Sequence, residues 1–220
     1  MGKLPRILGL SLLALSLSWP AFAEPPRSIK IGVLNDASGP YSDNAGEGSV
    51  SAAKMAAEDF MQKHPDFKVE IMSADHQNKA DVGSAIARRW IDQDNVDAIA
   101  DVPNSAVGLA VNEVVRGSKT ALIASSAASS DLTGKSYSPN TIQWTFDTWA
   151  ASHTIGEYLA HHGGKKWYFI ATDNALGKSM VRDGTSVIKS GGGTVLGSVN
   201  VPINTADYAS FILQADGFGA

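Results

Sequence analysis

The 220-residue sequence contains no cysteine, and this absence removes three kinds of chemistry at once. There can be no disulfide framework, no thiolate metal site and no cysteine nucleophile. A basic surplus is missing too, because 18 Lys and Arg stand against 22 Asp and Glu, a net charge of −4. Proteins that bind the nucleic-acid backbone carry such a surplus or a basic stripe, so we expect no nucleic-acid partner. What remains, 44% hydrophobic and 18% charged residues, is ordinary globular composition.

The first 23 residues have the pattern of a cleavable export signal. Lys3 and Arg6 precede an apolar stretch over residues 7–19, and Ala21-Phe22-Ala23 is a small-x-small cleavage site. The apolar stretch is too short to serve as a permanent membrane-spanning helix. Because no cysteine follows it, a lipid anchor is excluded. We therefore expect residues 1–23 to be removed and the remaining chain to reach the periplasm of a double-membraned bacterium.

From Ile29 onward, short apolar runs alternate with helical patterns. We expect strands at the runs that are rich in β-branched residues, namely Ile29–Leu34, Val69–Met72, Ala98–Val102, Ala121–Ala124, Trp167–Ala171 and Thr194–Val201. Apolar residues recur at helical spacing between these runs, and we expect Phe60 and Trp90 on those helical stripes to be core residues. This alternation predicts an α/β fold with parallel sheets, right-handed crossovers and helices on both faces of each sheet.

One polar stretch interrupts the alternation and indicates two lobes. The Ser/Ala-rich run Ala124–Ser130 is followed by a polar loop that continues to Asn140. Loops of this length are usually functional or lie between domains, so we place a domain crossing near Thr145. Residues 24–144 then form the N-terminal lobe and residues 145–220 the first part of a C-terminal lobe. That second block contains only two clear strands, too few for a stable sheet, so we expect the lobe to be incomplete.

Polar residues follow four of the predicted strands, where ligands of open α/β sheets bind. The four segments are Asn35–Tyr41, Pro103–Ser105, Ser125–Ser130 and Thr172–Gly177. Asn104 or Ser105 is a good helix cap, and the free amides of a helix N-terminus attract anions. The small side chains of the Ser/Ala loop allow close approach to its backbone, so both segments suit a carboxylate. Caps and turns of any protein use the same residue types, however, and that interpretation remains open.

Signals for an enzyme are poor. Gly46-Glu47-Gly48 lacks the third glycine of a dinucleotide fingerprint, and neither a GxxxxGK[ST] loop nor a GxSxG elbow occurs. The adjacent His161 and His162 cannot chelate one metal as a pair spaced by four could. We expect no catalysis, no cofactor and no metal site. Two aromatic residues, Tyr41 and Trp149, are candidates to stack on a ligand, although packing over the domain junction explains Trp149 equally well.

Three blocks of the sequence carry a resemblance to a known family. The blocks IKIGVLNDASGPYSDNAGEGSVSAAKMAAEDF, ALIASSAASSDLT and WTFDTWA resemble the type I periplasmic binding proteins, in particular the leucine/isoleucine/valine-binding family of ABC importers. The likeness runs from Ile29 to about Leu213, and the SGPY and FDTWA segments are similar to members that take aromatic carboxylates. The resemblance implies a two-lobed α/β protein without catalysis that closes on a small ligand. It also implies an inner-membrane permease with ATPase subunits as the partner.

The resemblance further implies particular site residues. Relatives hold the ligand carboxylate with a serine that matches Ser105 and with a loop that maps to Ser126, Ala127 and Ala128. Amino-acid binders commonly have threonine in place of Ala128, and their acidic partner for the ligand ammonium lies later than residue 220. A buried ammonium needs such a partner, and Asp147 is the candidate to replace it. The ligand is therefore an amino acid or an aryl carboxylate, with amides and urea as variants.

The family is considerably longer than this chain. We expect a truncated product that neither closes nor binds with the affinity of the family. Two other functions stay open. A sensory ligand-binding domain of a receptor would have a membrane-spanning segment downstream, and an exported α/β enzyme would need an activated nucleophile or a cofactor loop.

Overall fold

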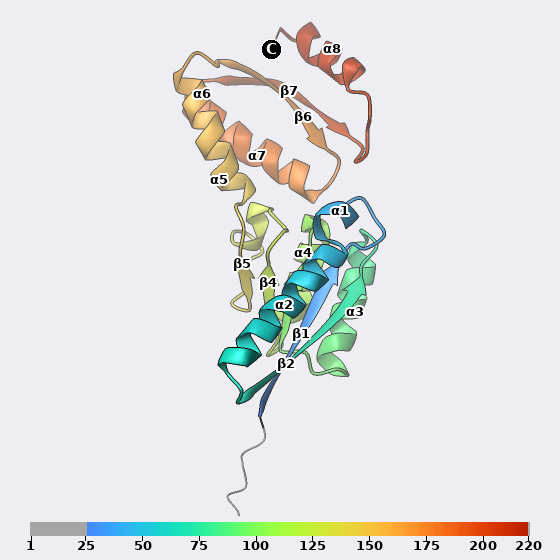
Figure 1. Cartoon of the computed structure of the whole chain (residues 1–220). Helices are drawn as coiled ribbons and strands as arrows, with labels where there is room; N and C mark the ends of the chain where they lie inside the picture. Colours follow the sequence, from blue (N-terminus) through green and yellow to red (C-terminus); the bar gives the residue numbers. More distant parts are fainter. Residues whose placement is uncertain (1–25, 220) are drawn as a thin grey trace, which may run out of the picture.

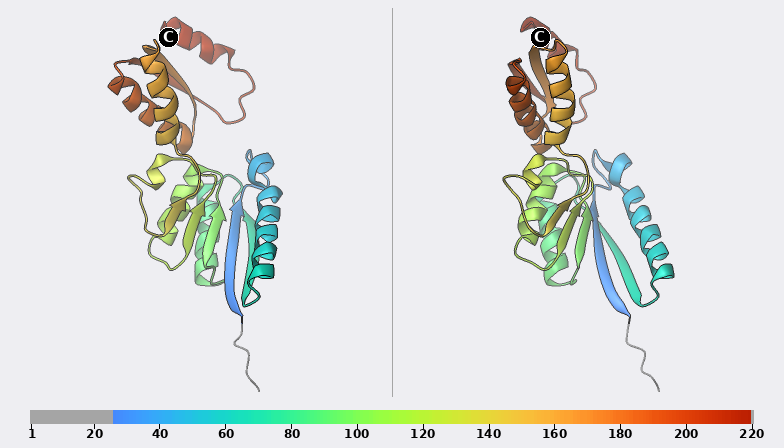
Figure 2. Two further views of the ribbon diagram at one scale, coloured as in Figure 1. Left: turned by 60° about the vertical axis from the view of Figure 1, so that its left-hand side comes forward. Right: turned by 90° about the vertical axis from the view of Figure 1, so that its left-hand side faces the viewer.

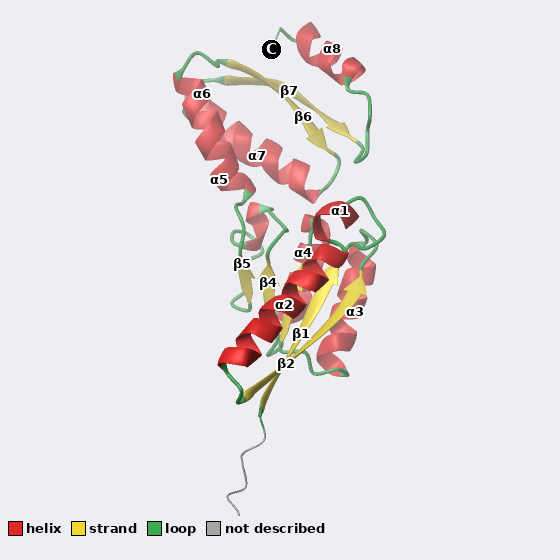
Figure 3. Ribbon diagram, in the orientation of Figure 1, coloured by secondary structure: helices red, strands yellow, loops and turns green. Residues whose placement is uncertain are grey.

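The computed structural model describes residues 26–219, which form two α/β lobes (Figures 1 and 3). The predicted export signal, residues 1–23, lies outside the described residues. The first-lobe elements are β1 (Arg27–Asn35), α1 (Ser42–Ala45), α2 (Glu47–Lys63), β2 (Phe67–Asp75), α3 (Ala80–Asp92), β3 (Ala98–Asp101), α4 (Ser105–Val115), β4 (Ala121–Ala124), η1 (Ser130–Leu132) and β5 (Thr141–Gln143). The following elements are α5 (Thr148–Ser152), the π-helical η2 (His153–Glu157), α6 (Tyr158–His161), β6 (Lys166–Thr172), α7 (Ala175–Ser190), β7 (Thr194–Val201) and α8 (Ala209–Gly217).

The first lobe is built on a five-stranded parallel sheet of order β2-β1-β3-β4-β5. The predicted α/β class with parallel strands is thereby confirmed. After β2 the chain crosses over β1 to place β3 on the other side, so the strand order reverses between β1 and β3. Such a reversal opens a crevice beyond the carboxyl ends of the two strands, because their connections leave toward opposite faces of the sheet.

Helices cover both faces of this sheet, with α2 on one side and α3 and α4 on the other (Figure 2). The main core lies under α3 and α4, where Trp90, Ile99 and Val111 are fully buried. Trp90 is a core residue as predicted, and it packs so closely over β1 that a Cβ on Gly32 would lie 2.4 Å from its ring. The prediction for Phe60 is wrong, because this side chain is 37% exposed. Its helix α2 buries only Val50 and Ala57.

The second lobe has a parallel two-stranded sheet of β6 and β7. Helix α7 packs on one face, where the ring of Phe169 lies against Gly184. On the other face the Tyr168 ring stacks on Phe218, just after α8, with 5.2 Å between ring centroids. The expected boundary near Thr145 falls between the last strand of the first sheet and α5, and we retain it as a proposal. None of the described helices is long and apolar enough to cross a membrane.

Candidate functional site between the lobes

The carboxyl ends of β1 to β4 face the second lobe (Figure 1). Backbone hydrogen bonds join the carboxyl ends of neighbouring strands. The Val102 amide after β3 donates to Leu34 O of β1 at 3.0 Å, and the Ser125 amide after β4 donates to Asp101 O of β3 at 3.2 Å. All four segments predicted from strand ends therefore begin at the inter-lobe side of a sheet.

Asp36 follows β1 and is fully buried, and it organises the loop that carries Tyr41. Its Oδ2 accepts a hydrogen bond from the Tyr41 amide at 3.0 Å. Its Oδ1 lies against Gly39, where a Cβ would come within 2.4 Å, so only glycine fits there. Burial, together with the nearby Asp36 carboxylate, raises the pKa of the half-buried Tyr41 phenol. Across the gap, the Asn174 amide at the start of α7 donates to the Tyr41 hydroxyl at 3.5 Å.

The turn after β2 contains a buried histidine that its sequence does not indicate. His76 is fully buried, and its Nδ1 accepts the Asn78 amide at 3.0 Å. Burial lowers the pKa of His76, although Asp36 and Asp75 oppose this effect, so the ring is neutral with its proton on Nε2. Asn78 also accepts a hydrogen bond from the Asn104 side chain. The turn after β2 is thus hydrogen-bonded, through Asn78, to the residue that caps α4.

Asp101, the last residue of β3, combines an unusual backbone conformation with a buried carboxylate. Its φ is +79°, and that of the following Val102 is +57°, a left-handed conformation that side chains rarely adopt. The side chain is buried, with one oxygen, Oδ1, accepting the Ser126 hydroxyl at 2.8 Å. The other oxygen, Oδ2, is buried without a hydrogen-bond partner among the described residues. Burial raises the pKa of Asp101, while the hydroxyls of Ser126 and Ser49 oppose the rise.

Asn104 and Ser105 open α4, and both are buried. The Asn104 side chain accepts the amides of Ala106 and Val107 at 2.6 and 3.2 Å, so it works as the helix cap. The Ser105 hydroxyl accepts the Ser129 amide at 3.2 Å. Its own proton takes part in no hydrogen bond between described residues, which leaves it available to a ligand acceptor.

The loop after β4 is held from several sides. The carbonyl of Ala127 accepts a hydrogen bond from the Gln143 amide of β5 at 3.0 Å, and that of Ala128 accepts the Thr148 amide at 2.9 Å. Both alanines are buried, and the Ser126 hydroxyl is already committed to Asp101. The loop is therefore a rigid part of the site. Its bonds fix the backbone that the sequence proposed as a carboxylate receptor.

A polar contact between α7 and the first lobe lies directly behind this loop. We call it the inter-lobe contact; its members are Ser129, Ser130, Asp131, Thr148, Ser179, Arg182 and Asp183. The hydroxyls of Ser129 and Ser179 are 2.6 Å apart, and Arg182 Nη1 donates to Asp131 Oδ1 at 2.6 Å. The largely buried Asp183 accepts the hydroxyls of Ser130 and Thr148, each at 2.6 Å.

Asp147 and Trp149 lie elsewhere, at a hollow of about 510 Å³ beside the inter-lobe contact. Asp147 caps α5, accepting the Ala150 amide at 2.7 Å. Trp149 is 55% exposed and stacks on His153 at 3.7 Å. The hollow is also lined by Lys135 and Arg182, but not by Ser105, Ser126, Ala127 or Ala128. The structure thus groups the predicted residues into two places rather than one.

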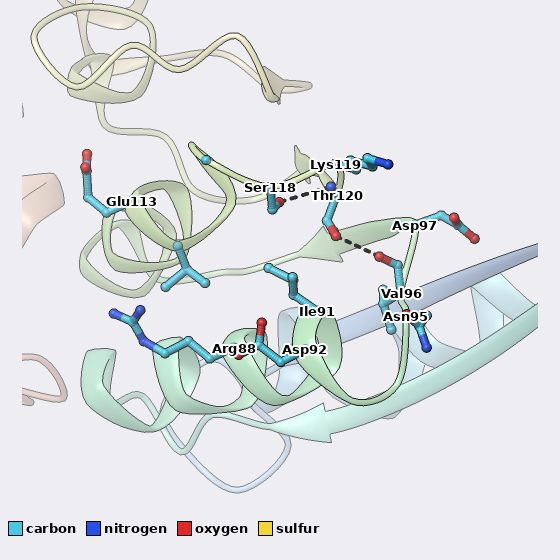
Figure 4. Close-up of a pocket in the computed structure, with 12 residues that line it drawn as sticks. Arg88, Ile91, Asp92, Asn95, Val96, Asp97, Glu113, Ser118, Lys119 and Thr120 are labelled. Carbon is cyan, nitrogen blue, oxygen red and sulfur yellow. Dashed lines mark hydrogen bonds between the residues drawn. The ribbon is translucent and has the colours of Figure 1, made fainter.

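A further hollow of about 640 Å³ opens at the opposite edge of the sheet, between the ends of α3 and α4 (Figure 4). Its lining includes exposed Arg88 and Asp92. Its polar loop groups pair with each other, since the Thr120 hydroxyl donates to Val96 O at 2.7 Å and the Thr120 amide to the Ser118 hydroxyl at 3.0 Å. This hollow lies away from the carboxyl ends of the strands, at which ligands of open α/β sheets bind.

Sequence reasoning found the segments of the site but missed three of its buried side chains, Asp36, His76 and Asp101. Asp75-His76 reads as a turn, and Asp101 as the end of a strand. A signal was present at Asp101, because a charged residue interrupts an apolar run at the point where ligands bind. Within residues 26–219, no group of three or more His, Asp or Glu side chains lies close enough to hold a metal ion.

Comparison with known proteins identifies the family. A model of the periplasmic binding protein family matches residues 28–220. A "Leu/Ile/Val-binding protein homolog 6" of Brucella abortus is 24% identical over 217 residues, covering 96% of this chain and 54% of the relative. The chain thus spans about half the length of the curated relatives it matches.

Solved structures agree with this result. A periplasmic binding protein of Burkholderia mallei is 38% identical with a TM-score of 0.82, over 88% of this chain and 52% of that one. A branched-chain amino acid ABC transporter ligand-binding protein of Burkholderia xenovorans is 36% identical, with a TM-score of 0.70 over 87% and 51%. A solute-binding protein of Rhodopseudomonas palustris, in complex with 4-hydroxybenzoate, shares the fold at 24% identity, with a TM-score of 0.71 over 88% and 52%. The chain belongs to the type I periplasmic binding proteins of ABC transporters.

Proposed function

We propose that this chain is the substrate-binding component of an ABC transporter in the periplasm. It captures a small ligand that bears a carboxylate, an amino acid or an aryl acid, between its lobes. It delivers that ligand to an inner-membrane permease with ATPase subunits and performs no catalysis itself. Family membership supports this role, as does the Burkholderia xenovorans relative, whose description names branched-chain amino acids.

The observation that carries the proposal is the arrangement at the ends of β3 and β4. The Ser105 hydroxyl accepts the Ser129 amide and keeps its own proton to donate, at an edge of the sheet that faces the second lobe. A hydrogen bond to a charged group contributes about 1.5–3 kcal/mol, so a few such donors suffice to hold a small anion. Asn104 contributes by capping α4, and Ala127 and Ala128 contribute through the loop backbone that their carbonyl hydrogen bonds hold. Ser126 contributes indirectly, through its hydrogen bond to Asp101.

An aryl carboxylate is the second candidate ligand. The Rhodopseudomonas palustris structure holds 4-hydroxybenzoate in the same fold, and Tyr41 offers a half-buried ring beside the strand ends. Trp149 lies at the hollow beside the inter-lobe contact and would stack only on a ligand that reaches that side.

Titration of the chain followed by ¹H–¹⁵N NMR tests the proposal, because it detects millimolar as well as tight binding. The panel is leucine, isoleucine, valine, benzoate and 4-hydroxybenzoate. We expect saturable shifts with at least one of them, and Ser105→Ala should weaken that binding at least tenfold through the loss of one charge-assisted bond. Ser84→Ala, in the first half of α3, where the hydroxyl donates only to the Asp81 carbonyl, is the control and should bind as the wild type does. Absence of binding throughout the panel, or an unaffected Ser105→Ala variant, would contradict the proposal.

A further inference from the structure

The turn after β2 is connected to the N-terminus of α4 by a series of side-chain hydrogen bonds. The Asn78 amide donates to His76 Nδ1 at 3.0 Å, and the side-chain oxygen of Asn78 accepts the side-chain amide of Asn104. Asn104 in turn caps α4, because its side-chain oxygen accepts two amides of the first helical turn. His76 is thus linked through two asparagines to the helix end that carries Ser105.

The backbone of this turn depends on side chains. Gln77 and Asn78 have left-handed φ angles of +54° and +56°, a region that only glycine adopts without cost. A side chain holds the amide of each residue, since Asp75 Oδ1 accepts that of Gln77 at 2.7 Å and His76 Nδ1 accepts that of Asn78. Loss of the His76 acceptor would therefore release Asn78 from a conformation that its backbone does not favour.

His76 can hold Asn78 only as a neutral ring. A neutral imidazole accepts at one nitrogen, whereas a protonated imidazole donates from both. Because Nδ1 accepts the Asn78 amide, the proton is on Nε2, which is buried and has no hydrogen-bond partner among the described residues. Protonation of Nδ1 would replace the hydrogen bond to Asn78 by two opposed N–H groups.

The surroundings of the ring determine the pH at which it gains a proton. His76 is fully buried, and the charged groups that face it are Asp36 after β1 and Asp75 of β2. The helices on this side bring uncharged groups, since a Cβ on Gly83 of α3 would lie 3.5 Å from the His76 Cβ and 2.4 Å from Val107 of α4. Burial lowers the pKa of His76 from its ordinary 6.5, although the two carboxylates oppose this effect. The ring is therefore neutral at neutral pH.

We propose that His76 is a positioning residue that makes ligand binding at the start of α4 sensitive to acid, because only its neutral ring holds Asn78 against the Asn104 cap. This inference rests on the proposed function, which places the ligand carboxylate at Ser105. The hydrogen bond is fully present above the unfolded-state pKa of the histidine and is lost as the pH falls through the folded-state pKa. Mild acid then frees the Asn78 amide, weakens the cap and lowers the affinity for the ligand.

The first test follows the ligand-free chain by ¹H–¹⁵N NMR from about pH 7.5 to about pH 5, the range in which histidine titrates. We expect the amides of Asn78 and Ala106 to shift with one midpoint, below the ordinary histidine value. Asparagine offers an oxygen near the position of Nδ1 and gains no proton, so His76→Asn should abolish this shared transition. The matched control is His64→Asn, an exposed histidine just before β2, which should keep the transition.

The second test measures the affinity for leucine and for 4-hydroxybenzoate at the two ends of this pH range. The wild type should bind at least about threefold more weakly at the acid end, as expected for the loss of one neutral hydrogen bond. His76→Asn should lose no such affinity in acid, whereas His76→Leu, which has no acceptor, should bind weakly at both pH values. Comparison of the wild type with His76→Asn cancels the titration of the ligand itself and of Asp101.

The outcomes distinguish this inference from the proposed function. Binding that weakens equally in the wild type and in His76→Asn overturns the role of His76, while the proposed function stands. The same holds for a transition at Asn78 that leaves Ala106 unchanged, or for no transition in the range. If the variants do not fold, the shared midpoint and the loss of affinity in the wild type decide. If neither ligand binds at either pH, the proposed function fails and this inference fails with it.

Discussion

Replacement of Asp183 by Asn should weaken the attachment of the second lobe to the first. Oδ2 of this largely buried residue accepts two hydroxyls, from Ser130 and Thr148, at 2.6 Å each. Its Oδ1 accepts Arg182 Nε at 2.9 Å. Three donors thus converge on one carboxylate, and two of them come from outside α7.

The magnitude follows from these contacts. Hydrogen bonds to a charged acceptor contribute about 1.5–3 kcal/mol each, roughly twice a neutral bond. Asn preserves the shape and one acceptor oxygen but loses the charge, so Asp183→Asn should destabilise the chain by about 2 kcal/mol. Asp183→Ala leaves the two hydroxyls and Arg182 Nε without this acceptor, although Arg182 Nη1 keeps Asp131, and the loss should reach about 3–5 kcal/mol.

Urea unfolding followed by circular dichroism measures the free energy of unfolding of each variant. The matched control is Asp173→Asn, just before α7, whose ion pair with Lys178 is long, 3.5 Å, and exposed. Such a pair contributes less than about 1 kcal/mol. A double-mutant cycle of Asp183→Asn with Thr148→Val should show a coupling of about 1 kcal/mol, since the two residues share one bond. Equal stabilities of the two Asn variants, or strict additivity in the cycle, would refute the reasoning.

Three further outcomes are expected. Gly32→Ala should lower stability by about 1–3 kcal/mol in thermal unfolding because its Cβ would lie 2.4 Å from the Trp90 ring. Gly48→Ala, which meets nothing within 4 Å, should be neutral or slightly stabilising; equal melting temperatures would contradict this packing. Burial raises the pKa of Asp101, so its contribution to stability is fully present below the unfolded-state pKa and is lost as the pH rises through the folded-state pKa. The free energy of unfolding of Asp101→Asn should therefore rise relative to that of the wild type as the pH rises. A difference in unfolding free energy that does not change with pH would contradict a raised pKa at Asp101. Although burial alone would raise the pKa of Asp183, its hydrogen bonds lower it, so the penalty of Asp183→Asn should be full near neutral pH and vanish as the pH falls through the folded-state pKa.

Most strands of both lobes could be predicted because they are short apolar runs between helical patterns. Ala121–Ala124 in the first lobe and Thr194–Val201 in the second occupy the residues expected, and the other expected strands differ by a few residues at their ends. An apolar, β-branched run between two helical patterns has few alternatives to a buried parallel strand. The cap at Asn104 likewise follows from local chemistry, since its side-chain oxygen satisfies helix amides two and three residues ahead.

The misses have a common cause, which is that a polar residue at an element end has the same local pattern whether it is exposed or buried. Asp36, His76 and Asp101 are buried only because loops and helices from distant segments close over them. Phe60 was expected in the core from its helical stripe, but α2 buries a short part of that stripe and leaves the ring 37% exposed.

The sequence alone determined the alternation of strands and helices, the parallel sheet and the strand ends at which a ligand would be bound. These properties follow from hydrophobic periodicity and capping, which act over a few residues. Only the tertiary structure decided that Arg182 and Asp183, on the polar side of an amphipathic helix, meet the loop after β4 instead of solvent. It also separated Asp147 and Trp149 from Ser105 and left one oxygen of Asp101 without a donor, because contacts between segments far apart in the chain set burial and hydrogen bonding.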